Sequence, residues 1–247
     1  MLIASVENTP ESLFTAVFEL YNEPREVYVT SEAAFQPSLT DEVIRIQAVR
    51  EKAERVRKGV LRAAGNGALQ EILTAHRSGE AEKDVAIFRY LLLLFREGKP
   101  GILNPSRPAV IAFQDVYSRV TLEAHRMKGF LRFQQTEEGV YFAEVQPDHN
   151  ILELIMPHFF NRYRDMRFLI YDSKRGIVGI SDTKKYRVFA SPQRLTANLS
   201  LGERQFQRMY KHYYDRISIA GRKNLRLMRR CMPVRYHKYM PEKDELL

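Results

Sequence analysis

The sequence has no tryptophan and a single cysteine, Cys231. One cysteine excludes an internal disulfide, and it also excludes a zinc site built from several thiolates of this chain alone. An iron–sulfur cluster with four thiolate ligands is excluded for the same reason, so such a cluster would have to reside in a partner protein.

Long apolar segments are also missing. The longest apolar run covers residues 90–95, which is far too short to span a bilayer. No basic segment followed by an apolar core opens the chain, as it would in a secretory signal peptide. We therefore expect a cytoplasmic protein with no membrane partner.

Several nucleotide-binding and catalytic motifs are absent. There is no Walker A loop, no Gly-x-Ser-x-Gly motif and no GxGxxG, because residues 65–68 lack the third glycine. Residues 79–81 match the start of a uracil-DNA glycosylase motif, but Glu82 and Lys83 stand where that motif needs proline and glycine. A glycosylase site of that type is therefore excluded, and no cofactor and no metal ligand are predicted.

Positive charge, by contrast, is abundant. The chain has 39 Lys and Arg against 30 Asp and Glu, which gives a net charge of +9. Twelve of these cations and only five of the acidic residues lie between Glu203 and the C-terminus. A local excess of this kind favours an anionic partner, and nucleic acid is the commonest one.

The pattern of caps, turns and apolar residues predicts an α+β fold, with mixed helices, a small and mainly antiparallel sheet, and basic C-terminal helices. Thr9-Pro10-Glu11 is a typical helix start, and residues 65–67 and 97–100 should end helices. The loop at residues 104–108 is the best internal boundary. It divides the chain into a mainly helical subdomain, 1–104, and a second one, 105–247, unless the two form one integrated domain.

In the second part of the chain, a helix to about Met127 should precede a hairpin of strands at 130–133 and 140–145. Pro147-Asp148 should open the next helix, which Pro157 should kink or split. Three antiparallel strands are then expected at residues 167–171, 176–180 and 186–189.

The C-terminal segment combines aromatic and basic residues. Ser200 and Glu203 fit a capping box at the start of a helix. That helix should carry Phe206, Tyr210, Tyr213 and Ile217 on one face, with Arg204, Arg208 and Lys211 on the opposite face. Such a surface suits phosphate contacts and base stacking, although the same pattern also suits amphipathic helices with tyrosines in the core.

The hypothesis of nucleic-acid binding includes cations of the C-terminal segment and of the region between residues 126 and 162. The candidate nucleic-acid-binding residues are Arg126, Lys128, Arg132, Arg162, Arg208, Arg222, Lys223, Arg226, Arg229 and Arg230. Arg126, Lys128 and Arg132 could equally bind a single phosphate without any catalysis.

Histidines provide the candidates for chemistry. His125, Asp148, His149 and His158 lie around one expected helix–hairpin–helix unit and could serve acid–base catalysis, anion binding or weak metal ligation. A hydrogen-bonded structural role is the alternative for each histidine, and Asp148 could serve only as a helix cap.

The same stretches carry a family resemblance. The matching segments are residues 125–133, 147–150, 158–159 and 162–163, the strand ending at Asp172, and residues 222–224, 232–236 and 240–242. In these segments the chain resembles a bacterial family described as DNA-metabolism or DNA-repair proteins, encoded beside a radical-SAM protein of DNA modification. Related domains are fused to a uracil-DNA glycosylase domain, which this sequence does not show after Glu242. The resemblance implies a process and a partner, but no reaction.

The sequence therefore supports three alternative hypotheses about function. The leading hypothesis is a DNA-binding protein of DNA repair or modification that is accessory to a radical-SAM partner. The second is an enzyme acting on a damaged base or nucleotide through the His125, Asp148, His149 and His158 region. The third is a protein-binding adaptor without affinity for nucleic acid. The sequence leaves open whether the chain catalyses any reaction, whether DNA or RNA and single or double strands are preferred, and which oligomeric state it adopts.

Overall fold

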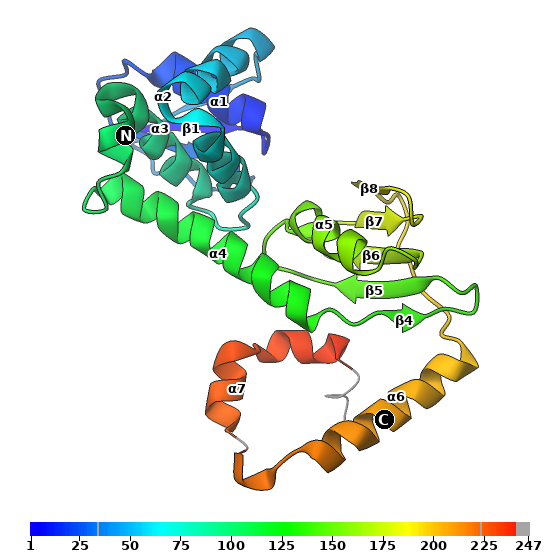
Figure 1. Ribbon diagram of the computed structural model, residues 1–247. Helices are drawn as coiled ribbons and strands as arrows, with labels where there is room; N and C mark the ends of the chain where they lie inside the picture. Colours follow the sequence, from blue (N-terminus) through cyan, green and yellow to red (C-terminus); the bar gives the residue numbers. More distant parts are fainter. Residues whose placement is uncertain (34, 223, 241–247) are drawn as a thin grey trace. The chain divides into compact units, whose positions relative to one another are not determined.

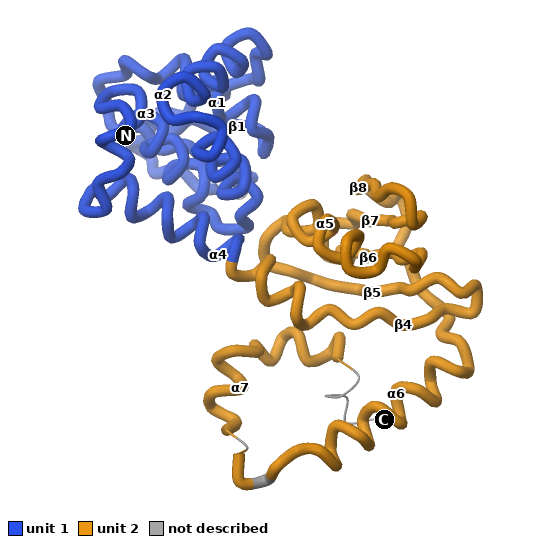
Figure 2. Tube along the Cα trace, viewed as in Figure 1, with its two compact units in different colours: residues 1–121 blue, residues 122–247 orange. Residues whose placement is uncertain are grey.

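The computed structural model describes residues 1–33, 35–222 and 224–240. The chain forms two compact units, residues 1–121 (unit 1) and 122–247 (unit 2), which Figure 2 colours separately. The division falls inside helix α4 (Pro108–Phe130), beyond the loop at residues 104–108 that the sequence suggested as a boundary. Helices combined with two small sheets make the fold α+β, as predicted from the sequence.

Unit 1 contains a three-stranded sheet built from β1 (Leu2–Val6), β2 (Val27–Thr30) and β3 (Glu42–Ile46). The strand order is β2-β1-β3 and both pairings are parallel, so the expectation of a mainly antiparallel sheet is wrong for this unit. The reason is helix α1 (Pro10–Leu20), which carries the chain back so that β2 starts at the same edge as β1. The predicted start of α1 is confirmed, because the Thr9 hydroxyl accepts the N–H of Ser12 at 3.2 Å.

Two long helices, α2 (Arg50–His76) and α3 (Lys83–Ile102), are each interrupted by a glycine. Gly65 has φ 87° and Gly98 has φ 70°, a left-handed conformation that glycine adopts without steric cost. The predicted helix breaks at both places are therefore confirmed. Neither these helices nor any other in the described part of the chain is apolar over a length that could cross a membrane.

Unit 2 contains a five-stranded sheet whose order follows the sequence, and Figure 1 shows helix α5 (Leu152–Arg162) lying against it. Its strands are β4 (Gln134–Gln135), β5 (Tyr141–Val145), β6 (Phe168–Asp172), β7 (Ile177–Ser181) and β8 (Tyr186–Ala190). The predicted antiparallel arrangement of β6, β7 and β8 is confirmed. β5 and β6 are parallel, because α5 connects them as a crossover.

Three expectations for unit 2 need correction. Helix α4 continues to Phe130, so the first hairpin strand is Gln134–Gln135 and not residues 130–133. Helix α5 begins at Leu152, so Asp148 lies in the preceding loop and does not cap the helix. Pro157 lies inside α5, and it does not split the helix in two.

The C-terminal part of unit 2 is helical and comprises α6 (Leu201–Ile217), η1 (Ala220–Arg222), α7 (Leu225–Cys231) and η2 (Val234–Tyr239). We call the described residues of 201–231 the basic arm. The capping box at its start is half confirmed. The Ser200 hydroxyl accepts the N–H of Glu203 at 3.0 Å, but the Glu203 carboxylate accepts the N–H of Gln135 in β4 at 3.0 Å and does not reach back to Ser200.

Candidate functional site

Five cationic or imidazole side chains line one cavity of about 560 Å³ in unit 2, which we call the basic pocket. His125 and Lys128 come from the last turns of α4, and Arg132 follows that helix. His158 and Arg162 come from α5, where a spacing of four places them on one face. None of the described residues that line the pocket is acidic.

The charges of the basic pocket act on His158. Partial burial lowers the pKa of its imidazole, and the neighbouring charges of Lys128 and Arg162 lower that pKa further. Within the described residues, neither Lys128 nor Arg162 forms an ion pair with a carboxylate. A surplus of positive charge in a partly enclosed site favours a bound anion.

The walls of the basic pocket are fixed by local contacts. The Arg132 guanidinium donates a hydrogen bond to the Gly129 carbonyl at 2.8 Å, which positions it at the end of α4. The rings of Phe159 and Tyr163 lie 6.2 Å apart with an interplanar angle of 2°. The Arg162 guanidinium lies 5.7 Å from the centre of the Tyr163 ring, so the pocket presents cationic and aromatic groups side by side.

Glu123 connects helix α4 to the loop between β5 and α5. Its carboxylate is only 4% exposed and accepts the N–H groups of Asp148 at 3.0 Å and His149 at 2.8 Å. The Asp148 carboxylate in turn pairs with the Arg235 guanidinium at 2.7 Å, while the His149 side chain is buried. Backbone N–H groups that are removed from water need hydrogen-bond acceptors, and the Glu123 carboxylate is the acceptor for these two.

The opposite side of this loop is bound by Arg175. Its guanidinium donates to the carbonyls of Pro147, at 2.9 Å, and Asp148, and it pairs with the fully buried Asp172 carboxylate at 2.9 Å. Asp172 also accepts the N–H groups of Lys174 and Arg175 at 3.0 and 3.2 Å. The loop is therefore fixed from two sides by ion-paired side chains.

The four candidate catalytic residues do not share one site. His125 and His158 both line the basic pocket, whereas Asp148 and His149 lie in the loop bound by Glu123. Their common position near one helix–hairpin–helix unit in the sequence does not bring them together, because α5 starts after Asp148 and His149, and the helix carries His158 away from that loop.

In the basic arm, helix α6 turns its apolar side to solvent. The exposed side chains are Phe206, Met209, Tyr213 and Ile217, at 54%, 63%, 57% and 55%. The buried side chains of this helix are polar, Glu203 and Gln207, and a hydrogen bond of 2.9 Å joins them. Phe206 and Tyr213 are therefore not core residues, so the alternative of an amphipathic helix with its aromatic side in the core does not apply to them.

Cations accompany these exposed rings. The predicted nucleic-acid-binding residues Arg208, Arg222, Arg226, Arg229 and Arg230 are all exposed in the arm. In the part of the arm that the structure describes, none of these arginines pairs with a carboxylate. Arg126 is half-buried on α4, and Lys223 lies outside the described residues. Figure 1 shows α6, in orange, running away from the five-stranded sheet of unit 2, and α7, in red-orange, where the chain turns back.

The far end of the arm returns to the core of unit 2 through η2. Tyr236 is 1% exposed, its hydroxyl donates to the Glu123 carboxylate, and its ring lies 5.9 Å from that of Phe130. Burial and the Glu123 carboxylate raise the pKa of the Tyr236 hydroxyl. Sequence reasoning assigned no role to Glu123, Arg235 or Tyr236, because the residues that join here are more than a hundred positions apart.

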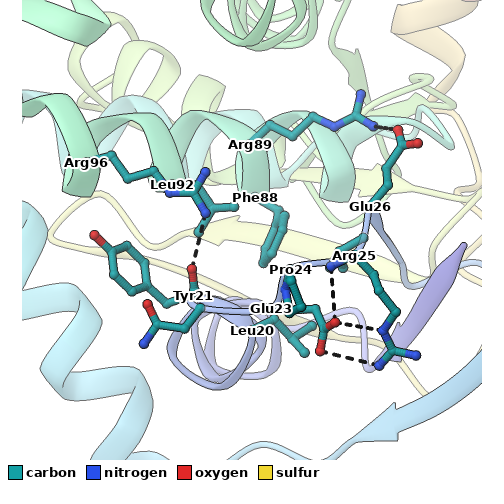
Figure 3. Close-up of a pocket in the computed structure, with 12 residues that line it drawn as sticks. Leu20, Tyr21, Glu23, Pro24, Arg25, Glu26, Phe88, Arg89, Leu92 and Arg96 are labelled. Carbon is teal, nitrogen blue, oxygen red and sulfur yellow. Dashed lines mark hydrogen bonds and ion pairs between the residues drawn. The ribbon is translucent and has the colours of Figure 1, made fainter.

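The cavity in unit 1 that Figure 3 shows is different in character, although at about 810 Å³ it is larger. It also contains arginines, but these have partners within the cavity wall. Arg25 pairs with Glu23 at 2.7 Å and Arg89 with Glu26 at 3.1 Å, as the dashed lines in Figure 3 mark. Two of its three arginines are therefore neutralised by carboxylates of the same wall, whereas the third, Arg96, donates to the Tyr21 carbonyl. The described lining of the basic pocket has no such carboxylates.

Comparison with known proteins identifies one family. The family model of DUF4130, a domain of unknown function, matches residues 81–242, which include all of unit 2 except its last residues. No curated protein matches the chain, and no solved structure matches it. Across the described residues, no group of three or more His, Cys, Asp or Glu side chains is placed to bind a metal ion.

Proposed function

Because the chain belongs to the DUF4130 family, whose function is unknown, we propose its function from the surfaces of unit 2: it is a DNA-binding protein that binds single-stranded segments through the basic arm. The observation that carries the proposal is the exposure of aromatic rings on α6 beside arginines without carboxylate partners in the described arm. Phosphates would contact the arginines, and unpaired bases would stack on the rings.

Single strands are favoured over duplex by the residue types. Phe206 and Tyr210 have nearly parallel rings, 6.1 Å between centres, and Phe206 and Tyr213 are more than half exposed. A flat, exposed ring contributes about 1–3 kcal/mol per stacked base, and only unpaired bases offer a free face to it. A duplex would use the arginines alone.

The wider role we propose is DNA repair or DNA modification together with a radical-SAM partner. The support is the resemblance in residues 125–133, 147–150 and 232–236, together with the positive charge of the arm. Since the chain has one cysteine, any iron–sulfur cluster in that system belongs to the partner.

Charge reversal in the arm tests the proposal. The triple variant Arg222→Glu, Arg226→Glu, Arg229→Glu should bind a fluorescent single strand at least tenfold more weakly than the unchanged protein, because three phosphate contacts become repulsive. The matched control is Arg45→Glu, Arg164→Glu, Lys184→Glu, which changes the net charge equally at exposed positions outside the arm. Equal affinities of the two triple variants would refute the assignment of binding to the arm.

Replacement of the exposed aromatic rings of α6 tests whether unpaired bases stack on them. Phe206→Ala with Tyr213→Ala should weaken binding of a single strand by about tenfold and leave duplex binding nearly unchanged.

The adaptor function is supported by the exposed aliphatic residues Ile219, Leu225 and Leu227 of the arm. If the unchanged protein binds the radical-SAM partner but no DNA, the adaptor replaces the DNA-binding function.

The enzyme hypothesis becomes narrower. Two of its four residues, His125 and His158, line the basic pocket, so in this version proton transfer to a base or nucleotide would depend on these two imidazoles. A base-modifying activity that survives in a His125→Gln, His158→Gln double variant would remove this hypothesis.

A further inference from the structure

We infer that the basic pocket recognises a phosphate monoester, and that its source is the terminal phosphate of a nucleic-acid strand. The source rests on the proposed function, whereas the chemistry rests on the pocket alone. The pocket is formed by α4, α5 and the residues after α4, so it is a different surface from the basic arm.

The charge of the pocket selects the ligand. Lys128 and Arg162 are cationic side chains that line the pocket and have no carboxylate partner within the described residues. A phosphate monoester carries a charge of about −1.5 to −2 at pH 7, whereas a phosphodiester inside a strand carries only about −1. Two converging cations therefore favour a terminal phosphate over an internal one.

The geometry supplies directed donors. Arg132 lines the pocket, and its guanidinium is oriented by the hydrogen bond to the Gly129 carbonyl. Planar guanidinium groups match phosphate oxygens in pairs, and His125 and His158 can each donate one ring N–H. Charged and neutral donors thus converge on the cavity from two helices.

The size and the aromatic wall indicate more than a bare phosphate. A cavity of about 560 Å³ lies within the usual range for small-molecule sites, about 300–1,000 Å³, and exceeds what one phosphate fills. Phe159 and Tyr163 line the same cavity, and Tyr163 is half-buried. The terminal sugar or base can lie against this wall while its phosphate contacts the cations.

The test compares strands that differ only at their ends. An internally labelled single strand is prepared with either a 5′-hydroxyl or a 5′-phosphate and titrated with the full chain by fluorescence anisotropy. The phosphorylated strand should bind about tenfold more tightly, as expected for charge-assisted hydrogen bonds that only a terminal phosphate makes. The Lys128→Gln, Arg162→Gln variant should lose this preference, whereas Arg164→Gln, an exposed cation that does not line the pocket, should keep it.

A second measurement needs no DNA binding. Inorganic phosphate or a nucleoside monophosphate is added while the imidazole resonances of His125 and His158 are followed by NMR. If the strands bind equally but mononucleotide shifts these resonances in the unchanged protein and not in Lys128→Gln, Arg162→Gln, the ligand is a free phosphate monoester. If the unchanged protein shows neither an end preference nor a resonance shift, the inference is wrong, even when DNA binding itself is observed.

Discussion

At the residue scale, the charged side chains of unit 2 fall into two groups: cations of the basic pocket without carboxylate partners, and buried carboxylates that accept several hydrogen bonds. Lys128 and Arg162 converge on a cavity without a carboxylate among the described lining residues, while Glu123 accepts several donors in the core of unit 2. The residue types around position 125 could be predicted from the sequence as an anion-binding group. Their separation from Asp148 could not, because it depends on where α5 begins.

His158 reports directly on the charge of the basic pocket. Burial and the cations Lys128 and Arg162 lower its pKa, so Lys128→Gln should raise that pKa by removing one positive charge. The measurement is an NMR titration of the imidazole between pH 4 and 9. Arg164→Gln serves as the control, and a Lys128→Gln protein with the unchanged titration midpoint would contradict the proposed electrostatics.

His76 in unit 1 should make stability depend on pH. Burial and the nearby Lys83 charge lower its pKa to about 4, whereas the unfolded chain binds this proton near 6.5. The unfolded state therefore binds more protons between these values, and the free energy of unfolding falls as the pH drops from about 6.5 toward 4. Urea unfolding at pH 7 and at pH 5 measures how much of the free energy of unfolding is lost between the two values. This loss should be smaller for His76→Gln than for His212→Gln, which replaces an exposed imidazole. Equal losses in the two variants would exclude His76 as the cause of the pH dependence.

Glu123 should be the most sensitive single position of unit 2. Glu123→Ala leaves the N–H groups of Asp148 and His149 without their acceptor and removes the partner of Tyr236. We expect a loss of about 3 kcal/mol in the free energy of unfolding, measured with urea. Glu138→Gln, an exposed carboxylate in the β4–β5 turn, should cost less than about 0.5 kcal/mol. A small effect at both positions would mean that the Glu123 contacts do not fix the loop.

At the element scale, local signals in the sequence predicted helix breaks well and helix faces poorly. Glycine at positions 65 and 98 interrupts α2 and α3 as expected, because this backbone conformation is a property of the residue itself. The exposed side of α6 could not be predicted from its pattern. Apolar residues at helical spacing usually face a core, but the hydrogen bond from Gln135 to Glu203 turns the polar side of α6 inward.

The glycines of the α2 break should respond oppositely to alanine. Gly65 has φ 87°, so Gly65→Ala should destabilise the protein by about 1–2 kcal/mol although no atom lies within 4 Å of the added Cβ. Gly67 has equally open surroundings without a positive φ, and Gly67→Ala should stabilise the helix by about 0.5–1 kcal/mol. The measurement is the free energy of unfolding of both variants in urea. If Gly65→Ala stabilised the protein, the interruption of α2 would not depend on a positive φ at position 65.

At the scale of the whole molecule, charge is distributed unevenly. The sequence from Leu201 to Cys231 has nine Lys or Arg and two Asp or Glu, which gives this segment a net charge of +7. The net charge of the entire chain is +9. That concentration was visible in the sequence, whereas the exposure of the rings beside it was not, because exposure depends on which side of α6 contacts the sheet. The proposed binding of single-stranded DNA uses both features, the cations for phosphates and the rings for bases.

The most direct test of the central claim is the salt dependence of binding to a single strand. Fluorescence anisotropy with the full chain and a labelled oligonucleotide at several salt concentrations gives the slope of log affinity against log salt. Each phosphate contact on a single strand contributes about −0.7, so one contact by each of the arm's five exposed candidate arginines predicts a slope of about −3.5. Binding with a slope near that value would support the account, and no detectable binding even at low salt would contradict it.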